Sequence, residues 1–211
     1  IALRDAFLRR SNGRPLILPR IRPLGEVGPD EVLLAGDLGI AADLPPPVGD
    51  LRRQLLLART IWAMDRNRPP GHAIGLAAAL AGLLDEVQTE RLSFDGLGAL
   101  VPDELAEHWK ASLHFLSVVT VHWPGVLEDE GAVDPAFHRD RLLAAQAEQW
   151  RRAPPAGRGY AAGSTGSIPA TADLLAVVAE LPEGLVVLPG LDRDMEDEEW
   201  RPIHDRHPQA G

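Results

Sequence analysis

Cysteine is absent from the 211 residues, so disulfides, iron–sulfur clusters and thiolate zinc sites are excluded within this chain. Lysine is almost absent too, because Lys110 is the only one. A Walker A loop needs a lysine directly after a glycine, whereas Lys110 follows Trp109, so the chain carries no such nucleotide loop. No apolar run approaches the roughly 18 residues that a membrane-spanning helix needs, so we expect no membrane partner.

Positive charge is also scarce, with 21 basic against 31 acidic residues and a net charge of −10. This balance argues against a generic basic nucleic-acid binder and against a protein of anionic membrane surfaces. The start of the chain is the exception, because a single aspartate there opposes six arginines: Arg4, Arg9, Arg10, Arg14, Arg20 and Arg22. The asymmetry fits either a phosphate-facing patch or ordinary surface arginines.

Hydrophobic spacing divides the chain into three parts. It predicts a helix over 1–10 and a short buried strand at 16–18, then helices over 51–65, 72–89, 103–123 and 135–152, the third ended by Pro124. Residues 159–192 are predicted to form a strand, a loop, a helix and a second strand, which together make one βαβ unit. The sequence therefore predicts an α/β fold, in which a parallel-sheet domain (1–49 and 156–211) carries an inserted all-helical subdomain (50–155).

The loop at 163–167, of sequence GSTGS, is the best local candidate for a ligand-facing loop, because it follows a predicted strand and precedes a helix. Its backbone N–H groups could hold a phosphate with help from the helix dipole. The same residues also suit a plain strand-to-helix turn with a hydroxyl cap.

Other groups of reactive residues indicate no catalytic or metal site, and no cofactor. The acidic stretch 192–199 lacks the glycine and glutamate that an EF-hand loop requires, and fits a solvated loop better. The histidines are scattered, which makes a zinc site improbable. Asp103, Glu104 and Lys110 have the wrong spacing for a nuclease core and fall on a predicted helix.

Five stretches of the sequence resemble one known family. They are LPRIRPLG at 18–25, LDEVQTE at 84–90, VPDELAEHW at 101–109, AGSTGSIPATADLL at 162–175 and VLPGLD at 187–192. Together they resemble the amino-terminal, helicase-like part of the AddB subunit of bacterial double-strand-break repair helicase–nucleases, in its alphaproteobacterial form. Since the chain begins at Ile1, inside a predicted helix, we expect it to be a piece of a longer protein.

The resemblance implies a RecA-like, P-loop NTPase-like fold, with the helical part as an inserted 1B-like subdomain. It implies a cytoplasmic subunit of an ATP-dependent helicase–nuclease, a hydrolase, that pairs with the motor subunit AddA and processes broken DNA ends for recombination. The family's nuclease residues and iron–sulfur cysteines lie outside this segment. In a working motor the strand at 160–162 would end in a magnesium-binding Asp-Glu pair, but here it runs into Gly163 and Ser164.

In such folds single-stranded DNA crosses the loops at the carboxyl ends of the strands. Arg20 and Arg22 follow the predicted strand at 16–18, and the hydroxyls of Ser164, Thr165 and Ser167 follow the strand at 160–162. We therefore expect these five residues to contact DNA phosphates. Two alternatives remain open: a protein-interaction scaffold that docks AddA, and a small enzyme that binds a phosphate or nucleotide at the loop 163–167.

Overall fold

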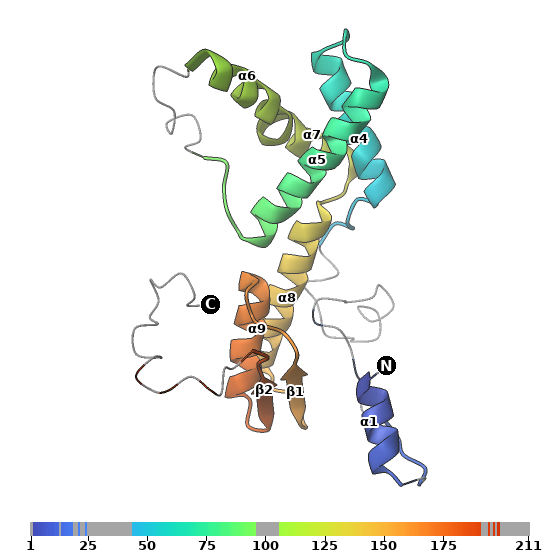
Figure 1. Ribbon diagram of the computed structural model, residues 1–211, viewed down its shortest axis with the longest axis vertical. Coiled ribbons are helices and arrows are strands. Elements are labelled where there is room, and N and C mark those ends of the chain that lie inside the picture. Colours follow the sequence, from blue (N-terminus) through green and yellow to red (C-terminus); the bar gives the residue numbers. More distant parts are fainter. Residues whose placement is uncertain are drawn as a thin grey trace.

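The computed structural model describes residues 2–12, 14–18, 21, 24, 44–95, 106–190, 194, 196 and 198. Most of the described chain is helical (Figure 1). The helices are α1 (Ala2–Arg10), α4 (Asp50–Met64), α5 (Pro70–Thr89), α6 (Ala106–Ser117), α7 (Trp123–Glu130), α8 (Pro135–Arg152) and α9 (Pro169–Glu180), and a π-helical turn η3 (Val118–His122) joins α6 to α7. Two strands, β1 (Gly159–Ala162) and β2 (Gly184–Val187), complete the described elements. None of the described helices is both long and apolar enough to cross a membrane.

The larger hydrophobic core lies in the helical half of the molecule. Helices α4 and α5 pack side by side (Figure 1). The turn η3 and helix α7 pack against α4 and contribute side chains to the same core. Its largest fully buried side chains are Leu57 and Ile61 of α4, Val118 of η3 and Trp123 of α7. The predicted helices over 51–65 and 72–89 are thus confirmed, and their apolar faces supply this core.

The prediction that Pro124 ends the third helix is wrong. Pro124 lies in the first turn of α7, and helical structure continues from α6 through η3 to Glu130. Proline lacks an N–H group and its ring crowds the carbonyl one turn before it, so a regular α-helix does not accommodate it. The wider π turn directly before α7 accommodates the proline and places Val118, Val119 and Trp123 in the core.

The predicted βαβ unit is confirmed. Strands β1 and β2 are parallel, with Tyr160 opposite Leu185 and Ala162 opposite Val187. Helix α9 covers one face of this sheet, where Ala161, Leu175 and Val178 form a small core. Helix α8, predicted at 135–152, is confirmed as well, and its Leu143 and Ala147 pack against α9.

The prediction of a RecA-like domain with a larger parallel sheet is wrong. The described residues form a single two-stranded sheet in a largely helical molecule. Residues 14–18, which include the apolar run at 16–18, form no strand, and Ile17 is 96% exposed. The run is three residues long and lies between Pro15 and Pro19, each of which lacks the N–H group that a sheet ladder needs.

A buried ion pair connects the helices that enclose the larger core. Arg53 Nε of α4 lies 2.8 Å from Oδ1 of Asp134, and both side chains are almost completely enclosed. Arg53 Nη1 also donates a hydrogen bond to Asp85 of α5, at 2.8 Å. The second carboxylate oxygen of Asp134 accepts hydrogen bonds from Gln88 Nε2 at 2.8 Å and from the Trp123 indole at 3.0 Å. Asp134 therefore connects α4, α5 and α7 at the point where α8 begins.

The packing of the βαβ unit leaves no room for a side chain at Gly184. A Cβ atom built on Gly184 would overlap the carbonyl oxygen of Val178 in α9 and lie 2.9 Å from Cβ of Leu181. We expect Gly184→Ala to destabilise the fold by about 2 kcal/mol or more, because the backbone of α9 must move to make room. Urea unfolding measures this change, and Gly157→Ala is the matched control because nothing lies within 4 Å of its added Cβ. Equal stability of the two variants would contradict the packing of β2 beneath α9.

Candidate nucleic-acid interface

The structure describes three of the five residues predicted to contact DNA. Ser164, Thr165 and Ser167 lie together in the loop that leaves the carboxyl end of β1 and enters α9, as the sequence predicts. Arg20 and Arg22 lie outside the described residues. The loop is therefore the part of the predicted interface whose geometry can be analysed directly.

Two glycines give the loop its shape. Gly163 and Gly166 have φ angles of +85° and +73°, a left-handed conformation that other residues adopt at a cost. Gly163 N–H donates to the carbonyl of Val187 at 3.2 Å, which ties the loop to β2. Gly166 N–H donates to Ser164 Oγ at 3.3 Å, and the hydroxyls of Thr165 and Ser167 lie 3.1 Å apart. Thr165 and Ser167 remain exposed, so their hydroxyls can still reach a phosphate.

The start of α9 offers few free donors to an anion. Ile168 occupies the N-cap position and no side chain caps the helix. Pro169 has no N–H group, and the N–H groups of Thr171 and Ala172 donate to the carbonyl of Ile168, both at 2.9 Å. The strongest anion sites at helix starts use several free N–H groups together. Here two of these N–H groups, on Thr171 and Ala172, already bond to the local backbone, so the exposed hydroxyls are the main groups that the loop offers.

The exposed arginines of the amino-terminal segment form the most basic described surface. Arg4, Arg9, Arg10 and Arg14 are all exposed, and Arg9 and Arg10 occupy the last turn of α1. Asp5 is the one acidic residue among the described residues 2–18, and no ion pair to these four arginines exists within the described part of the chain. Their charge is available to an external anion. The sequence showed them only as a charge asymmetry and placed the expected DNA contacts at Arg20 and Arg22 instead.

Several arginines outside this segment are already paired with carboxylates. Arg91 Nε lies 2.7 Å from Asp140 of α8 and its Nη1 lies 2.8 Å from Asp173 of α9, and these hydrogen bonds raise the pKa of Arg91. Hydrogen bonds to Glu130 and Glu183 likewise raise the pKa values of Arg52 and Arg158. Sequence reasoning missed Arg91, because its two partners lie 49 and 82 residues further along the chain.

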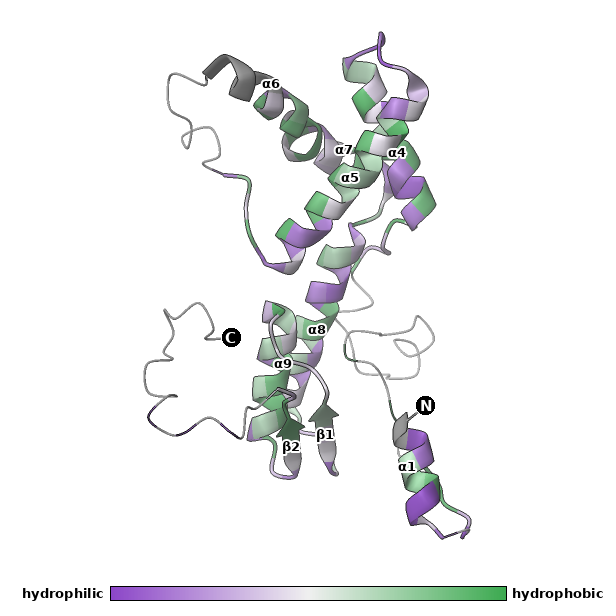
Figure 2. Ribbon diagram, in the orientation of Figure 1, coloured by the Kyte–Doolittle hydropathy of each residue, from purple (hydrophilic) through white to green (hydrophobic). Residues whose placement is uncertain are grey.

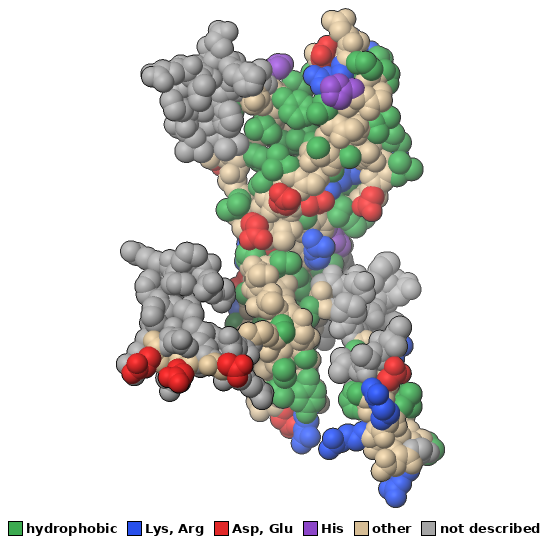
Figure 3. Space-filling view, viewed as in Figure 1, with side chains coloured by type: hydrophobic (Ala, Val, Ile, Leu, Met, Phe, Trp, Pro, Cys, Tyr) green, Lys and Arg blue, Asp and Glu red, His purple; other side chains and the backbone are tan. Residues whose placement is uncertain are grey.

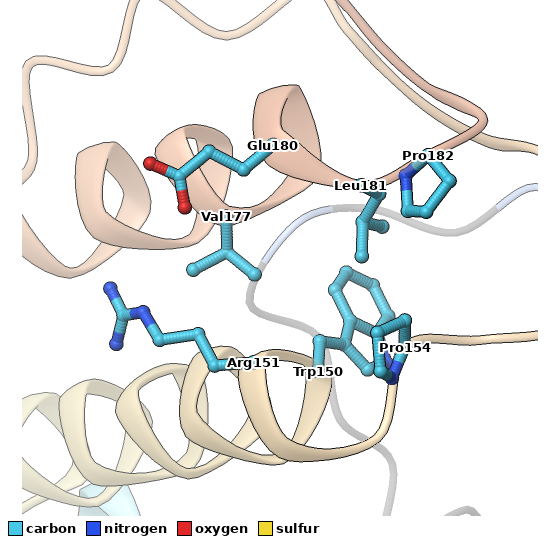
Figure 4. A pocket seen from close by; sticks show the side chains of 7 residues that line it. All are labelled: Trp150, Arg151, Pro154, Val177, Glu180, Leu181 and Pro182. Atoms are coloured by element: carbon cyan, nitrogen blue, oxygen red, sulfur yellow. The ribbon is translucent and has the colours of Figure 1, made fainter.

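A shallow cleft of about 150 Å³ lies where the ends of α8 and α9 meet (Figure 4). Trp150, Pro154 and Leu181 line its apolar part, while Arg151 and Glu180 face each other at the opposite end. The cleft is partly open to solvent, and none of its lining residues belongs to the loop 163–167. No group of three or more His, Asp or Glu residues in the described parts of the chain could hold a metal ion.

Comparison of the chain with models of protein families, with curated proteins and with solved structures gives no match. The assignment of a function therefore rests on the residues themselves. Two features bear on it: the exposed arginines of the amino-terminal segment, and the hydroxyl-bearing loop after β1.

Proposed function

We propose that this chain is a non-catalytic, DNA-binding segment of a cytoplasmic helicase–nuclease subunit of the AddB type, which works with AddA on double-strand breaks. The observation that carries the proposal is the cluster of exposed arginines at Arg4, Arg9, Arg10 and Arg14 in an otherwise acidic chain. The resemblance of the five sequence stretches named above supports the same proposal.

The chemistry of these arginines suits a phosphate backbone. A guanidinium group remains charged at any physiological pH and donates two parallel hydrogen bonds to a phosphate. Contacts of this kind position a protein on DNA without reading its sequence. Because the rest of the chain is acidic, it repels DNA, and binding is expected to concentrate on the amino-terminal segment and to weaken steeply with salt.

The loop 163–167 and the start of α9 also agree with a role in binding rather than in catalysis. The loop 163–167 has no lysine, and at the start of α9 the N–H groups of Thr171 and Ala172 already bond to the local backbone. This arrangement gives little support to the alternative of a small phosphate- or nucleotide-using enzyme. In the proposed role, Thr165 and Ser167 add hydrogen bonds to a strand that the arginines attract.

A quadruple variant tests the proposal. Replacing Arg4, Arg9, Arg10 and Arg14 by glutamine should weaken binding of single-stranded DNA at least about tenfold at low salt. A plot of the logarithm of the binding constant against the logarithm of the salt concentration should also become less steep, by about 3 units of slope. Each lost phosphate contact on a single strand removes about 0.7 from that slope. Fluorescence anisotropy of a labelled oligonucleotide, titrated at several salt concentrations, measures both.

The matched control replaces four exposed arginines on the helical part of the chain, namely Arg59, Arg139, Arg141 and Arg151. It removes the same total charge, so a general electrostatic effect would weaken binding equally in both variants. Equal losses in the two variants, or no loss in the first, would contradict the proposed interface.

A second candidate function, docking of the AddA subunit, is favoured by a different observation. Leu51 and Leu55 lie one turn apart on α4, and both are exposed although neighbouring residues of α4 are buried. Figure 3 shows further hydrophobic side chains at the surface of this helical part of the chain. Exposed leucines at this spacing suit a helix-to-protein contact. We expect Leu51→Ser with Leu55→Ser to leave the unfolding midpoint within a few degrees and to weaken co-purification of AddA several-fold. Unchanged co-purification would remove the support for this candidate.

A further inference from the structure

The buried hydrophobic residues divide most of the described molecule into two bodies. The larger core joins α4, α5, η3 and α7, which we call the helical body. The two smaller cores join α8 to α9 and α9 to the sheet, which together make the α8–α9 body. Helix α8 runs from the first body into the second (Figure 1). Figure 2 shows hydrophilic residues on the last turns of α5 and on the early turns of α8, so polar side chains contribute to the contact between the bodies.

The start of α8 is anchored to the helical body. Asp134, directly before α8, is held by the buried Arg53. The N–H group of Val133 donates to the carbonyl of Pro46 at 3.0 Å, and the N–H group of Val48 donates to the carbonyl of Val133 at 2.9 Å. These bonds fix one end of α8, whereas its other end packs within the α8–α9 body. A movement of one body relative to the other would therefore pivot at the anchored end.

Arg91, directly after α5, ties the helical body to the α8–α9 body at a second point. Its Nε lies 2.7 Å from Asp140 of α8, and its Nη1 lies 2.8 Å from Asp173 of α9. Within the described part of the chain, no other ion pair links the end of α5 to either helix. The Arg91 and Asp173 side chains are 38% and 49% exposed, so dissolved salt screens this contact.

The backbone of Arg91 shows that its side chain is not an incidental surface group. Arg91 follows the C-cap residue Glu90 and has a φ of +52°, a conformation for which helices usually carry glycine at this position. The N–H groups of Arg91 and Leu92 donate to the carbonyls of Gln88 and Val87, at 3.1 and 2.8 Å, and this closes the helix end. Glycine would adopt the same backbone at a lower cost. The two ion pairs are what the arginine side chain adds.

We propose that Arg91 is a salt-sensitive latch between the two bodies. At low salt the latch is closed, and the α8–α9 body lies against the end of α5 in the arrangement of Figure 1. When salt screens the charges of Asp140 and Asp173, the latch opens and the α8–α9 body swings about the anchored start of α8. The loop 163–167 belongs to this body and moves with it. The latch does not depend on the proposed DNA binding.

The distance between two spin labels measures the state of the latch, because the chain has no cysteine to interfere. Ala79→Cys on α5 and Ala179→Cys on α9 replace exposed alanines, one in each body, and carry the labels. Pulsed electron paramagnetic resonance of the whole chain gives the distribution of distances. We expect it to become at least about twice as wide between about 0.01 M and 1 M salt, as the range of electrostatic interactions falls from about 30 Å to 3 Å. An unchanged width would overturn the proposal.

Two substitutions at Arg91 separate the latch from the local helix end. Arg91→Gln removes both ion pairs, so at low salt it should give the width that the unsubstituted labelled chain shows at high salt. Arg91→Gly removes the same pairs but suits the observed φ angle, so a wide distribution in this variant cannot come from a damaged helix end. A narrow distribution at low salt in either variant would overturn the proposal.

The matched control is Arg152→Gln. Arg152 Nε lies 2.8 Å from Glu148 of the same helix, so this substitution removes one charge and one ion pair without separating the two bodies. Its distribution should match that of the unsubstituted labelled chain at both salt concentrations. A widening equal to that of Arg91→Gln would overturn the proposal, because loss of charge alone would then explain it. The measurement contains no DNA, so failure of DNA binding would count only against the proposed function.

Discussion

The ion pair between Arg53 and Asp134 is the interaction on which the rest of the structure depends. Both side chains are buried, so each has lost its hydration, and such a loss is tolerated only when the charges compensate each other. Asp85 supplies a second carboxylate to Arg53, while Gln88 and Trp123 donate to Asp134. The network favours one arrangement of α4, α5 and α7, because shifting any of these helices would remove an ion-pair or hydrogen-bond partner from a buried charge.

The same network sets the position of the βαβ unit. Helix α8 begins at Pro135, directly after Asp134. Near its other end, Trp150 packs against the small cores between α8 and α9 and between α9 and the sheet. Arg91 strengthens this connection, because it bonds to Asp140 of α8 and to Asp173 of α9 from the end of α5. The loop with Ser164, Thr165 and Ser167 is thus held at a fixed place relative to the helical core, which suits a scaffold that positions DNA.

Local patterns in the sequence were enough to predict the helices that form the core and the βαβ unit. Helix α8 shows an apolar stripe behind a proline, and the short apolar runs at 160–162 and 185–188 flank a helix of the right length. Interactions between distant parts of the chain could not be read in this way. Neither Arg91 nor the π turn before Pro124 has a local signature. The run at 16–18 resembled a strand, but apolar content cannot replace the backbone donors that its flanking prolines lack. For the candidate site, the sequence placed the hydroxyl loop between a strand and a helix, as observed, but could not show that Thr171 and Ala172 N–H bond to the backbone at Ile168.

A double-mutant cycle on Arg53→Met and Asp134→Leu, measured by urea unfolding, tests the central claim most directly. If the pair holds the helices in place, each single variant should lose about 3–5 kcal/mol, because it leaves one buried charge uncompensated. The double variant should lose clearly less than the two single losses together, with a coupling energy of about 2 kcal/mol or more. Additive losses would contradict the account, because they would mean that the two residues stabilise the fold independently.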